Sequence, residues 1–314
     1  MKGAGVADRN GLGLVKTAKS LSAALPDLLV EARRVAATVA AGWHGRRQAG
    51  PGETFWQFRP FTAGESVGRI DWRRSARDDH LYVREREWES AHTVWLWPDL
   101  SPSMDFQSRL APVTKRDRAV VLLLAVADLL ARGGERVGVP GLLRPTPHRA
   151  AAERAAAALT HLTGREAFPD SHPIRRFSDL VLVGDFLDPI ETTAAVLTRI
   201  AGSGARGHLV QVMDPVEETF PFAGRTEFRD PETGARIVAG RAEDWQAAYR
   251  DRLAAHRDQL RRLAARLGWT YLIHHTDRSA AEPLLALHGR LSASARGAGN
   301  VKAGGSVSTL EVAS

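Results

Sequence analysis

The 314-residue sequence predicts an α/β protein: a mostly parallel β-sheet with helices on both faces, preceded by an N-terminal helix and a small β-rich subdomain. Two patterns predict this class. From Thr93 onward, short and continuously apolar segments alternate with helical segments, which is typical of parallel strands whose connecting helices cover the sheet. Before Thr93, glycine-punctuated segments alternate apolar and polar residues with the two-residue period of strands.

These patterns divide the chain into four expected regions. Residues 1–42 should form a mobile N-terminus followed by a docking helix, and residues 43–91 a β-rich subdomain. Residues 92–291 should form the main α/β domain. Residues 292–314 are rich in Gly, Ser and Ala and are predicted to be a disordered tail, because this composition buries little apolar surface.

The composition is that of a globular protein with a basic balance of charge. Hydrophobic residues make up 44% of the chain and charged residues 25%, and 43 Lys and Arg against 36 Asp and Glu give a net charge of +7. This charge permits attraction to nucleic acid, anionic lipid or an acidic protein and selects none of them. The chain has no cysteine, which excludes disulfides and fits a reducing compartment. No membrane-spanning segment or signal peptide is evident, so we expect a cytoplasmic protein.

Apolar residues recur at helical spacing between Ser20 and Ala41, and Gly42 follows as a helix-ending residue. Pro26 lies near the expected start of this helix, where proline is tolerated. The pattern favours a helix that packs its apolar face on the main domain over one that lies on a membrane surface. The apolar positions are Leu25, Leu28, Leu29, Ala32, Val35, Ala36 and Val39.

The β-rich subdomain is expected around two alternating segments, Thr54–Arg59 and Leu81–Glu89. Between them lies an arginine- and tryptophan-containing run over Arg69–Asp79. Arginine beside tryptophan can pair with phosphate and stack on bases, so nucleic acid is an alternative partner of this run. The candidate partner-binding residues are Arg69, Arg73, Arg74 and Arg77.

Charge balance weakens the nucleic-acid interpretation. Residues 46–90 hold nine arginines against eight acidic residues, which leaves a net charge of only +1. Near balance indicates Arg–carboxylate pairs that stabilise the subdomain itself. Asp71 and Trp72 are interpreted as structural, while the arginines stay open between a structural and a partner-binding role.

The main domain should begin with a strand over Thr93–Trp97 and end with a helix over Ala280–Leu291. A Pro-rich irregular segment should follow Val139, and a hairpin should lie at Thr226–Val238 with Asp230–Gly234 as its turn. The remaining expected elements are helices over 115–132, 150–162, 191–201 and 243–267, and strands over 136–139, 179–183, 207–213 and 270–274.

An acidic residue and two hydroxyls follow the first strand of this domain. Asp99, Ser101 and Ser103 lie at alternate positions directly after an apolar strand, so they can point at one place. Carboxylate, hydroxyl and water oxygens are the ligands that Mg²⁺ prefers. Ligands of open α/β sheets also bind outside the carboxyl ends of strands. The pattern indicates a site for Mg²⁺ or Mn²⁺, and the alternative is a loop that caps the following helix.

Motifs of several enzyme classes are absent from the sequence. Ser101 is not in a Gly-x-Ser-x-Gly elbow, and no histidine is placed by the sequence to activate it. His274 and His275 are adjacent and would point to opposite faces of a strand. No Walker-type Gly-rich loop is present either, so we expect a protein that is not an enzyme.

Two strings of sequence together resemble one known family. The first runs over Phe58–Glu65 and Arg69–Arg77 and leads into Leu81–Glu85, and the second is the Asp-x-Ser-x-Ser-Met that begins at Asp99. Across residues 40–215 the chain resembles the bacterial family known as domain of unknown function 58. The resemblance implies a von Willebrand factor A-like domain and a gene commonly encoded beside one for a MoxR-type AAA+ ATPase.

The resemblance also implies a site. In A-type domains a first-strand Asp-x-Ser-x-Ser, a Thr from a second loop and a late Asp form a metal-ion-dependent adhesion site. A carboxylate of the partner completes the Mg²⁺ shell there. Asp99, Ser101 and Ser103 match the first motif, and Asp185 lies after a buried strand where the late Asp belongs.

The Thr of such a site has no clear counterpart, because neither Thr160 nor Thr163 lies in a Gly-Thr loop. What the resemblance implies is a non-enzymatic adaptor that binds an acidic protein segment through a Mg²⁺-dependent site, with a MoxR-type AAA+ ATPase as a partner. A metal-free interaction scaffold and a nucleic-acid-binding protein that uses residues 69–77 are the alternatives.

Overall fold

The chain divides into two units, one of Met1–Gly45 with His92–Ser314 and one of Arg46–Ala91. We call them the main unit and the small unit. The computed structural model describes residues 7–43, 55–77, 79–86, 91–162, 166–171 and 173–303.

The main unit is built on a six-stranded sheet with the strand order β10-β7-β6-β3-β4-β5. The edge strand β5 is antiparallel to β4, and the other neighbours are parallel. This mixed α/β architecture with a mostly parallel sheet confirms the predicted fold class. The strands are β3 (Thr93–Pro98), β4 (Arg136–Val139), β5 (Leu143–Thr146), β6 (Asp179–Gly184), β7 (Arg206–Met213) and β10 (Thr270–His275).

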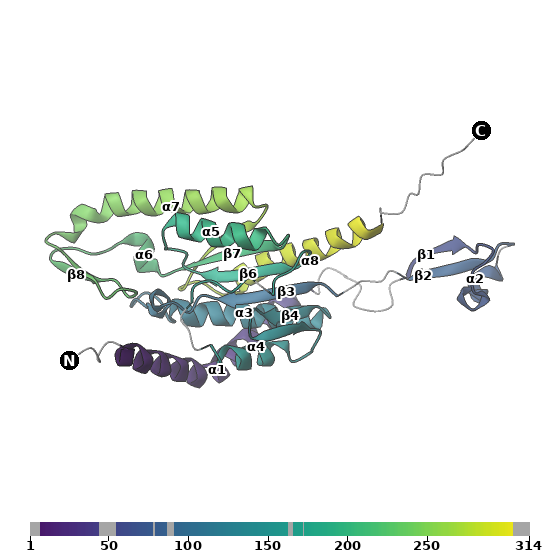
Figure 1. Ribbon diagram of the computed structural model, residues 1–314, viewed down its shortest axis with the longest axis horizontal. Helices are drawn as coiled ribbons and strands as arrows, with labels where there is room; N and C mark the ends of the chain where they lie inside the picture. Colours follow the sequence, from purple (N-terminus) through teal and green to yellow (C-terminus); the bar gives the residue numbers. More distant parts are fainter. Residues whose placement is uncertain are drawn as a thin grey trace. The chain divides into compact units, whose positions relative to one another are not determined.

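Helices cover both faces of this sheet (Figure 1). On one face α3 packs against β3, β4, β6 and β7, and α1, α4 and α8 pack against α3. On the other face lie α5 and α7, which contact each other, and α7 also contacts β10. The helices are α1 (Ala7–Trp43), α3 (Lys115–Arg132), α4 (Ala151–Leu159), α5 (Ile190–Ala201), α6 (Pro215–Thr219), α7 (Gln246–Arg266) and α8 (Ala281–Ala303).

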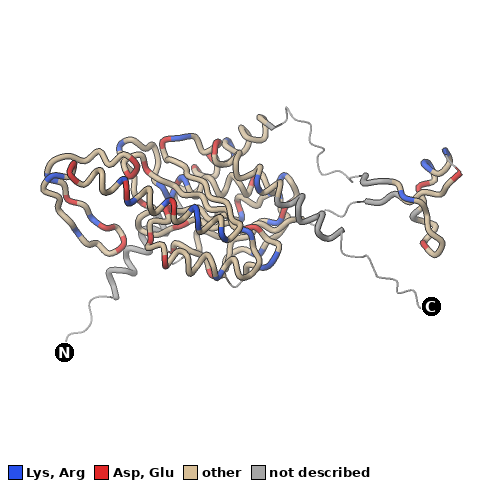
Figure 2. Tube along the Cα trace, turned by 90° about the horizontal axis from the view of Figure 1, so that it is seen from above, with Lys and Arg blue, Asp and Glu red and all other residues tan. Residues whose placement is uncertain are grey.

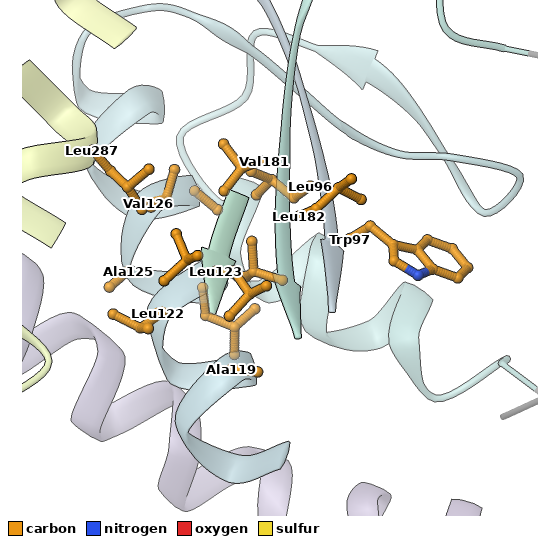
Figure 3. Packing of buried hydrophobic residues seen from close by; sticks show 14 of the residues in the cluster. Leu96, Trp97, Ala119, Leu122, Leu123, Ala125, Val126, Val181, Leu182 and Leu287 are labelled. Atoms are coloured by element: carbon orange, nitrogen blue, oxygen red, sulfur yellow. The ribbon is translucent and has the colours of Figure 1, made fainter. Parts of the chain in front are cut away.

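The central helix α3 is apolar on nearly every side because it lies between the sheet and three other helices. Figure 3 shows Leu123 of α3 near Leu96 and Leu182 of the sheet, and Leu287 of α8 near Val126 on another side of the helix. Thr114 begins α3 by accepting a hydrogen bond from the backbone N–H of Asp117. None of the helices in the described ranges is both long and apolar enough to cross a membrane.

The N-terminal helix α1 packs its apolar stripe against α3. The helix begins at Ala7, well before the Ser20 that its apolar spacing predicts, because residues 7–19 include the good helix formers Ala, Leu and Lys. Residues 1–6 of the region predicted to be mobile lie outside the described ranges. The buried stripe consists of Leu21, Leu25, Leu28, Ala32, Val35, Ala36 and Val39.

Two other expectations about secondary structure are wrong. The Pro-rich segment after Val139 contains the strand β5, in which Pro145 is tolerated because the strand lies at the sheet edge. The last helix does not end at Leu291 but continues to Ala303, into the region predicted to be disordered. Alanine has the highest helix propensity and supports this extension, and residues 304–314 lie outside the described ranges.

The expected hairpin lies outside the main sheet as a separate two-stranded ribbon, β8 (Thr226–Arg229) and β9 (Arg236–Ala239). Before it comes the short helix α6, for which no helix was expected. Asp214 caps α6 and Pro215 occupies its first turn, which is a common arrangement at helix starts.

The small unit contains the antiparallel strands β1 (Phe55–Pro60) and β2 (Tyr82–Arg86) with the one-turn helix α2 (Trp72–Ser75) between them. Asp71 begins α2 by accepting a hydrogen bond of 2.9 Å from the backbone N–H of Arg74, in line with its structural interpretation. The Ser75 hydroxyl accepts from the backbone N–H of Tyr82, which ties the helix to β2. Residues 87–90 at the end of the expected second strand lie outside the described ranges.

Candidate functional site

The order of the strands creates a switch point between β3 and β6. After β3 the chain crosses to α3 on one face of the sheet, whereas after β6 it crosses to α5 on the other. The two connections therefore diverge, and the crevice between them is where ligands of open α/β sheets bind. Asp99 directly follows β3 and Asp185 directly follows β6, so both predicted carboxylates lie at this crevice.

The loop after β3 is folded around Asp99. The Asp99 backbone N–H donates to the Val183 carbonyl at 2.8 Å, and Asp99 Oδ1 accepts from the backbone N–H of Ser101 at 2.8 Å. The hydroxyls of Ser101 and Ser103 are 3.1 Å apart. The structure thus brings Asp99 and the two predicted serines together in one loop.

Gly184 leaves room for the Asp99 side chain. A Cβ at this position would lie 2.7 Å from Asp99 Cβ and 2.9 Å from Asp99 Oδ2, closer than carbon atoms pack. The carboxylate therefore lies directly against the end of β6, and only 3% of the Asp99 surface is exposed.

The electrostatics of Asp99 indicate a missing positive charge. Burial, and to a smaller extent the neighbouring Asp185, raises the pKa of Asp99 to about 7, although the hydroxyl and N–H of Ser101 lower it. Among the residues that the structure describes, no Lys, Arg or His side chain forms an ion pair with Asp99. Near neutral pH this carboxylate is stabilised either by a proton or by a cation.

Asp185, by contrast, already has a cationic neighbour. The Lys115 ammonium, at the start of α3, donates to Asp185 Oδ2 at 2.9 Å and to Glu217 Oε1 at 2.6 Å, with 1% of the lysine side chain exposed. Burial lowers the pKa of Lys115, but Asp185 and Glu217 outweigh it, so the net pKa is raised and the lysine is charged. The sequence contains no local signal for this contact, because it joins residues far apart in the chain.

A third acidic residue follows the neighbouring strand β7. Asp214 is fully buried, accepts from the backbone N–H of Ser108 at 2.8 Å and forms a reciprocal capping box with Glu217. These contacts join the start of α6 to the loop that leads into α3. The Asp-Pro after an apolar strand was a usable sequence signal for this residue, because parallel strands end at one edge of the sheet.

The β8–β9 hairpin supplies a further carboxylate. Glu232, in the turn of the hairpin, accepts a hydrogen bond of 2.9 Å from the backbone N–H of Ser103. Sequence reasoning identified the turn but gave Glu232 no role, since nothing in the local sequence shows where a hairpin tip will lie.

The second-loop Thr of an adhesion-type site is not evident among the described residues. The Thr160 hydroxyl donates to the Ala157 carbonyl of its own helix, and Thr163 lies outside the described ranges. The described part of the chain also contains no cluster of three His, Cys, Asp or Glu side chains arranged for a metal. A divalent cation at this crevice would therefore depend on serine hydroxyls and water together with Asp99.

The candidate arginines lie in the small unit. Arg74 is half-buried, with its guanidinium 4.7 Å from the centroid of the Tyr82 ring. Arg73 and Arg77 are exposed, while Arg69 ends a 3₁₀ helix and its side chain lies outside the description.

Trp72 does not have the buried position that its structural interpretation implies, because it is 58% exposed. Its exposure beside the exposed Arg73 leaves the nucleic-acid alternative open for the small unit. In the main unit, Figure 2 shows basic residues intermixed with acidic ones along the chain. An electrostatic surface for a phosphate backbone would instead gather basic residues on one face.

Comparison with known proteins gives the following matches. A model of the family described as "Protein of unknown function DUF58" matches residues 57–259. Uncharacterized proteins of Mycobacterium bovis and Mycobacterium tuberculosis are 28% identical over 281 residues, covering 82% of this chain and 86% of each relative. Among solved structures, a conserved hypothetical protein BatB from Bacteroides thetaiotaomicron is 14% identical with a TM-score of 0.35, covering 66% of this chain and 100% of that one. An aerotolerance-related membrane protein from Bacteroides fragilis is 16% identical with a TM-score of 0.39, covering 65% of this chain and 100% of that one.

Proposed function

The chain belongs to the DUF58 family, and we propose that it is a non-enzymatic adaptor that binds an acidic segment of a protein partner through a divalent cation held beside Asp99. The observation that carries this proposal is the buried Asp99 carboxylate, which lies at the switch point of the sheet without an ion-pair partner among the described residues. Such a carboxylate favours a bound cation, because desolvated charge is costly unless it is paired.

The donor atoms around Asp99 fit a hard cation. Asp99, Ser101, Ser103 and Asp185 supply carboxylate and hydroxyl oxygens, and the chain has no cysteine to supply a thiolate. Mg²⁺ keeps several waters in its shell, so a site with few direct protein ligands suits it. Bound there, the ion would offer a coordination position that a carboxylate of the partner can fill.

Lys115 has a positioning role in this proposal. Its ammonium donates a hydrogen bond to one carboxylate oxygen of Asp185, while the other oxygen accepts one from the backbone N–H of Leu187 at 3.3 Å. These contacts orient the Asp185 carboxylate at the crevice edge, and Asp185 would act on the cation through water.

The partner follows from the same chemistry and from the family resemblance. A cation beside buried carboxylates attracts an Asp or Glu side chain of another protein. The resemblance to DUF58 proteins supports a MoxR-type AAA+ ATPase as the protein with which this adaptor acts.

Titration calorimetry of the EDTA-stripped protein with Mg²⁺ and Mn²⁺ tests the cation site. We expect saturable binding that Asp99→Ala weakens at least tenfold, on the order of what loss of a ligand or its support costs. Asp258→Asn, which removes an exposed carboxylate from α7, is the matched control and should bind as the wild type does. Equal binding by wild type and Asp99→Ala, or none by either, would contradict the cation site and favour a metal-free scaffold.

The pH dependence of that binding is a second expected result. Because a proton and the cation compete for Asp99, whose pKa is about 7, metal affinity should fall as the pH drops below that value. One proton competing at this pKa makes the apparent dissociation constant roughly tenfold larger at about pH 6 than at about pH 8. A flat affinity over this range would show that Asp99 is not a ligand.

A further inference from the structure

The tip of the β8–β9 hairpin lies on the loop that carries the candidate cation ligands. Ser103 donates its backbone N–H to Glu232 Oε1 at 2.9 Å, across 129 residues of sequence. Ser103 is also one of the two serines whose hydroxyls lie 3.1 Å apart. The protein therefore places one of its own carboxylates beside the serines proposed to hold the cation that receives the carboxylate of a partner.

The turn holds Glu232 in a defined position. Asp230 Oδ1 accepts from the backbone N–H of Glu232 at 2.9 Å, and Asp230 Oδ2 accepts from the Thr233 hydroxyl. The Gly234 N–H donates to the Asp230 carbonyl at 2.9 Å. Gly234 has a backbone φ of +73°, which residues other than glycine rarely adopt. Because these bonds lie within the turn, the backbone of Glu232 keeps its position independently of the contact with Ser103.

The hairpin is anchored through an aromatic cluster on β8, while its turn is lightly held. Phe228 of β8 stacks on Phe220 and Trp245, and Phe220 stacks on Tyr249 of α7. The strands β8 and β9 form a sheet separate from the main one, and the turn with Glu232 lies beyond Phe228. The hydrogen bond to Ser103 is exposed to water, which competes for both groups, so the turn can leave without unfolding the domain.

We propose that Glu232 is an internal occupant of the carboxylate site and that a partner binds by displacing it with an acidic residue presented in a similar tight turn. This inference rests on the proposed function, because it specifies how that same site is regulated. The hairpin then keeps the site closed against weak acidic ligands, because a tethered carboxylate acts at a high effective concentration. A partner gains access only when the free energy of its own contacts with the site exceeds that of the contacts that Glu232 loses.

The test uses a labelled cyclic peptide that carries the sequence of the protein's own turn, Arg229–Arg236, and measures its binding to the full-length protein in Mg²⁺ by fluorescence anisotropy. We expect Glu232→Ala to bind the peptide at least tenfold more tightly than the wild type does, because the internal competitor is gone. Glu227→Ala removes a carboxylate from β8 of the same hairpin, where Glu227 pairs with Arg236 at 3.1 Å, and should bind like the wild type. The same peptide with glutamine in place of its glutamate should lose the binding to Glu232→Ala.

The outcomes separate this inference from the proposed function. Equal peptide affinity of wild type and Glu232→Ala would overturn the internal competitor while leaving a carboxylate-binding site in place. No peptide binding by any variant, with Mg²⁺ binding intact in calorimetry, would also overturn it, because the turn would then have no affinity for the site. Loss of Mg²⁺ binding itself would instead show that the proposed function is wrong.

Discussion

Replacing Lys115 by methionine is expected to lower the free energy of unfolding by about 3–5 kcal/mol, the usual cost of removing one partner from a buried ion pair. The Lys115 ammonium is the shared cation of Asp185 and Glu217, and its side chain is almost completely buried. Methionine keeps the length and the apolar stem of lysine but leaves both carboxylates without their cation. Urea unfolding of the two proteins at neutral pH measures the difference.

A surface pair on α7 gives the control. Arg261→Met removes the partner of Asp258, and because both side chains are exposed the change should cost no more than about 1 kcal/mol. Adding Asp185→Asn and Glu217→Gln to Lys115→Met should recover part of the lost stability, because no buried charge is then left unpaired. A loss from Lys115→Met no larger than that from Arg261→Met would contradict the buried ion pair.

Asp99→Asn is expected to stabilise the metal-free protein at high pH. The folded-state pKa of Asp99 is raised to about 7 from an ordinary value of 3.8, chiefly by burial, so between these values the folded protein holds a proton that the unfolded chain has lost. The stability contributed by that proton is lost as the pH rises through this window. Asparagine resembles the protonated form at every pH, so the variant does not lose this stability. For the wild type the loss reaches about 4 kcal/mol, at 1.36 kcal/mol per pKa unit.

Urea unfolding in EDTA at several pH values measures this effect. The variant and the wild type should have similar stability near pH 4, and the variant should gain steadily up to about pH 8. Adding Mg²⁺ at high pH should raise the free energy of unfolding of the wild type and leave that of the variant unchanged, because a ligand stabilises only the protein that binds it. If the free energies of unfolding of the two proteins changed with pH in parallel, the raised pKa of Asp99 would be contradicted.

Local patterns were enough to predict most elements of the main domain. Strands such as β6, with six consecutive buried residues, and helices such as α3, with a Thr cap and a Gly stop, have their whole signal within one stretch of sequence. The edge strand β5 was missed because its proline opposes strand formation locally, and only pairing with β4 stabilises it. The end of α8 was misplaced because an Ala-, Ser- and Gly-rich composition does not decide between helix and disorder.

The sequence by itself determined the α/β class, the family of the chain, and a loop of Asp99, Ser101 and Ser103 at the carboxyl end of a strand. These features depend on local periodicity and on residues close together in the chain. Only the tertiary structure decided what surrounds that loop. The ammonium of Lys115 and the carboxylate of Glu232 come from α3 and from a separate hairpin. Such long-range contacts form because strand order and hairpin packing bring distant residues to one edge of the sheet, and no local pattern encodes them.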